Sequence, residues 1–157
     1  MNDQKLSPLG QAAVLGGMIG FVALIVWVAY RIIVAHEPRP IYGAIRMTAP
    51  LEYHEWYEKT AQCAQLPNLD YSKIEWYVIP DVVTFPTDIG EKVALWEALP
   101  DGYSRITVAD FYVNNEMVVR HEMLHDLLNR FGRPTGHPAL YFEDRCGLTW
   151  STWKGPI

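Results

Sequence analysis

The chain has 157 residues, of which 50% are hydrophobic and 20% charged, and its formal net charge is -5. Such a length accommodates one domain of ordinary size. No charged residue lies between Lys5 and Arg31, whereas the chain from His36 onward holds 11 of the 13 Lys and Arg residues and 17 of the 18 Asp and Glu residues. An acidic remainder of this hydrophobicity excludes a basic nucleic-acid binder and a disordered acidic tail.

The first predicted element is a transmembrane helix over residues 12–34, after a tail of residues 1–11. This segment has 23 residues and is interrupted by a charge only at Arg31, while a span needs about 20 apolar residues. Trp27 and Tyr30 lie where aromatic side chains border a bilayer. The alternatives are a buried core helix, which is seldom apolar on every face, and a cleavable signal peptide, whose apolar region is shorter. We therefore expect a single-pass membrane anchor.

One face of this helix carries small residues at every fourth position, namely Ala12, Gly16 and Gly20. A stripe of this kind lets a second helix approach closely, although glycine is also common in membrane helices in general. It predicts packing against another transmembrane helix, either of a second copy or of a larger membrane complex. The positively charged residues after the helix favour a cytoplasmic domain, but two cysteines are compatible with a disulfide outside the cytoplasm.

A linker over residues 35–47 is expected next, because Pro38 and Pro40 disfavour helix at the residues before them. The remaining residues, 48–157, read as one domain. Aromatic residues at three- and four-residue spacing predict a helix over 51–64. Runs of β-forming residues predict strands over 74–79, 82–85, 90–96 and 104–109, with Pro86 ending the second of them. The expected fold class is α+β.

The most informative stretch is a predicted helix that begins at Asn114 or Asn115 and ends at Phe131, before Gly132. It contains the pattern His-Glu-x-x-His at His121, Glu122 and His125. Histidines four residues apart project from one helix face and can bind a single Zn²⁺. Glu122 lies beside such a metal and can act as general base and then general acid. The surrounding residues are apolar, so a metal would satisfy polar groups that are otherwise costly to bury.

A third metal ligand is required, and the residues leave more than one candidate. His137 lies twelve residues after His125 in a Gly-His-Pro sequence, where glycines and prolines could fold the loop back to the helix. The alternatives are Glu143 or Asp144, and a site without a third protein ligand. Each residue can also be interpreted without a metal. His137 would then be a turn residue, and the two acids would be surface groups.

The stretch from His121 to His125 resembles the active-site helix of the zincin metallopeptidases. That resemblance implies a helix that follows a mixed sheet, with the edge strand of the sheet along the substrate groove, and it assigns residues 104–109 to that strand. The sequence departs from the metzincins, because Leu128 and Phe131 stand where that subgroup has Gly and His. The thermolysin-like subgroup has a later Glu on a second helix, and Glu143 lacks clear helical surroundings.

A broader resemblance, over about residues 51–147, is to small bacterial envelope proteins with a zincin-like domain. It rests on Trp56 before Cys63, the run 76–80 (Trp-Tyr-Val-Ile-Pro), the His-Glu-x-x-His stretch, Gly-His-Pro at 136–138 and Arg-Cys at 145–146. It implies a disulfide between Cys63 and Cys146 and His137 as the third ligand. It also implies a location in the bacterial inner membrane, with the domain on the periplasmic side.

Two functions follow as hypotheses. In the first, the chain is a membrane-anchored zinc metallopeptidase that hydrolyses a peptide substrate, with Glu122 as the catalytic residue and a tyrosine such as Tyr141 helping to polarise the carbonyl group. In the second, it is a non-catalytic accessory subunit of a large respiratory or photosynthetic membrane complex, built on a zincin-like scaffold. Nucleic acid is not an expected partner of the acidic domain.

Overall fold

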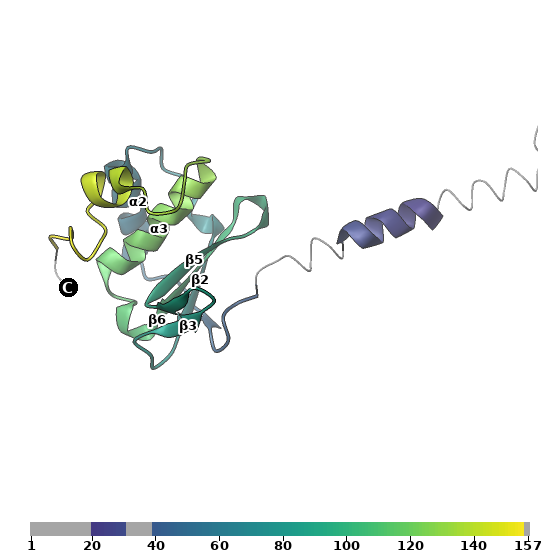
Figure 1. Cartoon of the computed structure of the whole chain (residues 1–157), viewed down its shortest axis with the longest axis horizontal. Coiled ribbons are helices and arrows are strands. Elements are labelled where there is room, and N and C mark those ends of the chain that lie inside the picture. The colour runs from purple at the N-terminus through teal and green to yellow at the C-terminus, as the bar shows by residue number, and fades with distance from the viewer. Residues whose placement is uncertain (1–19, 31–38, 156–157) are drawn as a thin grey trace, which may run out of the picture. The chain divides into compact units, whose positions relative to one another are not determined.

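A computed structural model describes residues 20–30 and 39–155 of the chain. The chain divides into two units, Met1–Glu37 and Pro38–Ile157, each of which we describe by itself. In the first unit, residues 20–30 are helical (Figure 1).

The predicted transmembrane helix over residues 12–34 is contradicted by this structure. Within the described ranges, no helix combines the length and the apolar character that crossing a membrane requires. The expected location, a single-pass anchor in the bacterial inner membrane, depended on that helix and is corrected with it. Of the small-residue stripe, Ala12 and Gly16 lie outside the described residues, and no described neighbour lies within 4 Å of the Cβ position of Gly20.

The second unit is built on a four-stranded mixed sheet in the order β1-β2-β6-β5 (Figure 1). The central strands β2 (Ile74–Ile79) and β6 (Ser104–Ala109) run parallel, and β1 (Ile45–Arg46) and β5 (Ala94–Ala98) flank them antiparallel. With its helices, this sheet gives the α+β class expected from the sequence. Strand β1 lies inside the segment 35–47 that was expected to be a linker.

Two helices pack against the sheet, α2 (Glu52–Ala64) and α3 (Glu116–Arg130). Alternate residues of β2 and β6 point toward them, because successive side chains of a strand face opposite sides of the sheet. Both helices follow the sequence prediction closely, since each has a periodic apolar face and defined ends. The buried core between these layers includes Tyr53, Tyr57, Trp76, Ile106, Met123 and Leu127.

The region between β2 and β6 differs from the prediction. The expected strands 82–85 and 90–96 are replaced by a hairpin of β3 (Phe85–Thr87) and β4 (Gly90–Lys92), followed by β5. Pro86 lies within β3 instead of ending it, which is possible because the hairpin is a separate two-stranded sheet whose outer side needs no donor. The carbonyl of Val93, between β4 and β5, accepts a hydrogen bond from the Ala109 N–H at 2.9 Å.

The chain after α3 forms a short π-helical turn, η4 (Leu140–Arg145), which contacts α2. A disulfide joins Cys63 near the end of α2 to Cys146 directly after η4, across 83 residues. The pairing implied by the resemblance to envelope proteins is therefore present. The side chain of Arg145 adds a second link, because its Nη1 donates to the Ala64 carbonyl at 2.9 Å.

Candidate metal centre

Helix α3 carries two of the candidate ligands and has well-defined ends. The Asn115 side chain accepts a hydrogen bond from the Val118 N–H at 3.1 Å and caps the first turn. Gly132, just after the helix, has the left-handed φ of +62° that this stop requires. Between these ends His121 and His125 lie one turn apart, so their side chains share a face of the helix.

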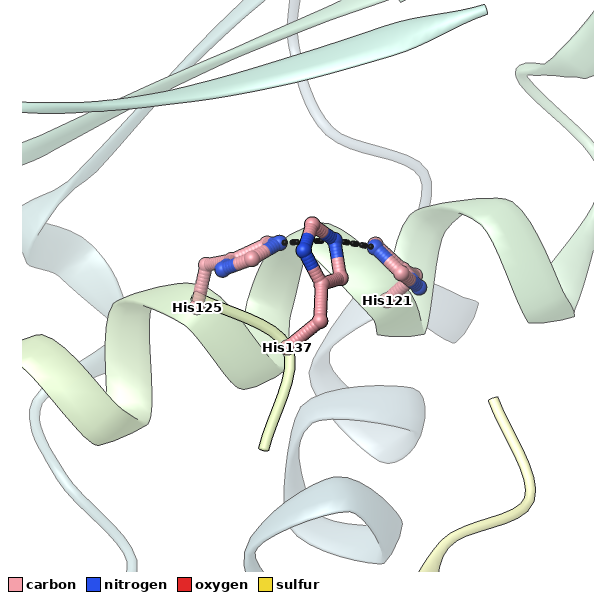
Figure 2. A group of neighbouring side chains, drawn as sticks. All are labelled: His121, His125 and His137. Carbon is pink, nitrogen blue, oxygen red and sulfur yellow. Dashed lines mark hydrogen bonds between the residues drawn. The ribbon is translucent and has the colours of Figure 1, made fainter. Parts of the chain in front are cut away.

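His137 reaches this face from the loop after α3, and Figure 2 shows its ring between those of His121 and His125. Its Nε2 lies 2.9 Å from the Nε2 of His121 and 3.2 Å from the Nε2 of His125. One nitrogen from each of the three residues lies within 4.8 Å of the others, so the group could hold a metal ion. The backbone of His137 adopts the left-handed conformation, with φ of +55°.

Two of the three separations between these nitrogens are close to those around a small tetrahedral ion. Ligands about 2.0–2.1 Å from a tetrahedral Zn²⁺ are about 3.3 Å from one another. The nitrogen of His137 lies 2.9 and 3.2 Å from those of His121 and His125, and all three lie within 4.8 Å of one another. The alternative ligands Glu143 and Asp144 are exposed on η4 and are not part of the group. Glu143 does have helical surroundings, contrary to the sequence prediction.

A hydrogen bond decides which ring nitrogen of His121 faces the group. Its Nδ1 lies 2.7 Å from the carbonyl oxygen of Leu148. A carbonyl can only accept, so Nδ1 carries the proton and donates it. The neutral ring then has its lone pair on Nε2, which points toward His137. Metal-bound histidines are commonly fixed by such a bond from the other ring nitrogen to a backbone carbonyl.

The three rings are neutral near pH 7, which is the form that binds metal. Burial lowers the pKa of His121 to about 4 and that of His125 to about 3. It also lowers the pKa of His137, and the charge of Lys92 acts in the same direction there. A cation therefore does not have to displace protons from these residues near neutral pH.

Glu122 lies in the same pocket, one residue after His121, and is 8% exposed. Burial raises its pKa to about 8, while a hydrogen bond from the backbone of Trp96 and the charge of Lys92 oppose that rise. In the absence of a metal this carboxyl group therefore holds a proton near neutral pH. A divalent cation beside it would favour the ionised form and lower this pKa.

The group opens into a pocket of about 470 Å³. Strand β5 forms one wall, because it is the last strand on that side of the sheet and Ala94, Leu95 and Trp96 line the cavity. The expectation that residues 104–109 would be this edge strand was wrong, since β6 lies inside the sheet between β2 and β5. The mouth includes Ile89 of the hairpin and Trp150, which are 73% and 60% exposed.

Several contributors to the site were not found from the sequence. Phe142 is fully buried, and its ring centroid lies 4.7–4.9 Å from those of all three histidines. Lys92 supplies a positive charge, and Leu148 supplies the carbonyl that orients His121. None of them belongs to a local motif, and no signal in the sequence marked them. Tyr141, named above as a group that could polarise a carbonyl, does not line the pocket.

Comparison of the chain with protein-family models, with curated proteins and with solved structures gave no match.

Proposed function

We propose that this protein is a zinc-dependent metallopeptidase with a zincin-like active site, in which His121, His125 and His137 bind the metal. The observation that carries the proposal is the convergence of three neutral imidazoles beside a buried carboxyl group in an open pocket. Three histidines with a free fourth position are typical of catalytic zinc sites, whereas structural sites are closed by four protein ligands.

The wall of the pocket supports a peptide as the substrate. Strand β5 pairs with β6 on one side only. An extended peptide can add to such an edge through main-chain hydrogen bonds, while its side chains occupy neighbouring pockets. Apolar residues at the mouth, Ile89 and Trp150 among them, offer surface for those side chains.

In this proposal Glu122 moves the proton. Bound Zn²⁺ would supply Lewis acidity toward a carbonyl oxygen and toward water. With the cation present Glu122 is ionised and accepts a proton from the attacking water. Its burial keeps the protonated form accessible, so Glu122 can then deliver that proton to the amine that leaves when the peptide bond breaks.

The test is the substitution Glu122→Gln, with Glu143→Gln as the control, because Glu143 is exposed and outside the pocket. We expect about one zinc per chain in the wild type and in both variants. Peptide cleavage should fall about 10²- to 10⁴-fold in Glu122→Gln and stay unchanged in Glu143→Gln. Metal analysis and cleavage of a mixed peptide library measure the two quantities. A protein that binds zinc but cleaves no peptide would be a non-catalytic zinc protein and would contradict the proposal.

A further inference from the structure

The ring of His125 is held differently from that of His121. Its Nδ1 is buried and has no hydrogen bond of good geometry among the described residues, although the Thr135 backbone is near enough to favour protonation. His121 instead donates from Nδ1 to the Leu148 carbonyl. Metal-binding histidines usually have a hydrogen-bond partner of that kind, and at His125 aromatic contacts add to the weak one from the Thr135 backbone.

Two aromatic side chains supply those contacts. The Trp96 ring of β5 stacks on His125 with a centroid distance of 5.7 Å and an angle of 16° between the planes. Phe142 lies against His125 at 4.8 Å, tilted by 48°. Flat contact with a large ring restricts rotation of the imidazole about its χ2 angle, which otherwise has a broad minimum.

A chain of hydrogen bonds holds the Trp96 ring in place. The indole N–H donates to the Ser104 Oγ at 3.0 Å, and the Ser104 hydroxyl donates to Oδ1 of Asp126 at 2.6 Å. Ser104 and Asp126 are both fully buried. This chain joins β5, β6 and α3, and it ends on the residue directly after His125.

Asp126 is itself fixed by one residue of α2 and by another residue of its own helix. The Tyr57 hydroxyl of α2 donates to its Oδ2 at 2.8 Å, and the Arg130 guanidinium forms an ion pair with the same oxygen. Arg130 also donates from Nη1 to the Asp70 carbonyl at 2.9 Å. Every polar atom of the Asp126 carboxylate is thus engaged, which leaves it little freedom to move.

We propose that Ser104 and Asp126 are positioning residues for the metal centre, and that they act by fixing the Trp96 ring against His125. The proposal rests on the metal site proposed above and does not depend on the reaction that this site performs. It assigns to an aromatic stack the orienting role that a hydrogen bond plays at His121.

The experiment is a double-mutant cycle on the full chain with Ser104→Ala and Trp96→Leu, read out as Zn²⁺ affinity and as the visible spectrum of the Co²⁺-loaded protein. We expect Ser104→Ala to weaken Zn²⁺ binding about tenfold and to change the Co²⁺ spectrum. In the Trp96→Leu background, Ser104→Ala should have no further effect, because the ring through which Ser104 acts is absent. Additive effects of the two substitutions would overturn the proposal.

Thr107→Val is the matched control. Thr107 is also buried on β6, but its hydroxyl forms no hydrogen bond with the described residues. It should leave Zn²⁺ affinity and the Co²⁺ spectrum unchanged, while urea unfolding shows whether each variant is folded. An equal loss of affinity in Thr107→Val would reduce the role of Ser104 to general support of the sheet and overturn the proposal. A wild-type protein that binds no metal would overturn the metal site itself.

Discussion

At the scale of single residues, burial has the largest effect on the protonation of the pocket, and the charge of Lys92 has a smaller one. Its charge lowers the pKa of His121, His137 and Glu122. Replacing it with methionine removes that charge, so we expect the pKa of each of the three groups to rise. Titration of the metal-free protein followed by NMR measures these values residue by residue.

The same variant contains its own reference, because the charge of Lys92 is not among the causes of the low pKa of His125. A further control is Lys73→Met, since the Nζ of Lys73 contacts the Asp101 carbonyl outside the pocket. An unchanged or lower pKa of His121 in Lys92→Met would show that Lys92 does not act on the group as described.

At the scale of elements, the disulfide holds η4 and the chain after it against α2. Phe142 lies on η4, and Leu148, which orients His121, follows Cys146 by two residues. We expect the double substitution Cys63→Ser and Cys146→Ser to lower the free energy of unfolding by about 2–4 kcal/mol, as removing the closure of a long loop does. It should also weaken Zn²⁺ binding, because Phe142 and the Leu148 carbonyl become less constrained. Urea unfolding and metal titration measure the two effects.

Arg145→Met provides the comparison for that prediction, because it removes the other link between this segment and α2, the hydrogen bond to the Ala64 carbonyl. This bond should contribute less than the disulfide, since a single hydrogen bond adds only about 0.5–1.5 kcal/mol to stability. If the double serine variant were as stable as the wild type, the constraint on η4 would have to come from packing and from the Arg145 hydrogen bond.

At the scale of the whole molecule, the pocket predicts how the stability of the metal-free protein depends on pH. His121 and His125 have pKa values of about 4 and 3 in the fold against 6.5 in the unfolded chain, so the unfolded chain binds more protons below pH 6.5 and stability falls with falling pH. Glu122 has a pKa of about 8 in the folded protein against 4.5 in the unfolded chain. Between these two values the folded protein binds more protons, so its free energy of unfolding falls as the pH rises toward 8. The lowered pKa of His137 adds to the decline on the acid side, so the free energy of unfolding has a maximum between the acid and the alkaline declines.

Urea unfolding of chelator-treated protein between pH 5 and pH 8.5 tests this dependence. Glu122→Gln should remove the decline on the alkaline side and leave the decline on the acid side. A stability that rises steadily through pH 8 in the wild type would contradict the raised pKa of Glu122.

Features encoded by neighbouring residues could be predicted from the sequence, and features that depend on distant segments could not. The strands 74–79 and 104–109, both helices of the domain and the pair His121 and His125 follow from local patterns. Other contributors reach the site from segments that are distant in the sequence, and no local spacing rule predicts such contacts. They are Lys92, Phe142 and Leu148. The prediction for residues 12–34 rested on composition alone, whereas a membrane span also needs sufficient helix length, and no described helix combines that length with apolar character.

The three candidate ligands are not equally mobile, and this difference orders the steps of metal exchange. His121 and His125 are fixed on one helix, whereas His137 is exposed on a loop. A chelate with two rigid arms and one hinged arm captures an ion on the rigid pair first and closes with the hinged arm afterwards. Release reverses this order, so the lifetime of the bound ion is governed by the opening of a loop of a few residues, which is far faster than the unfolding of a helix.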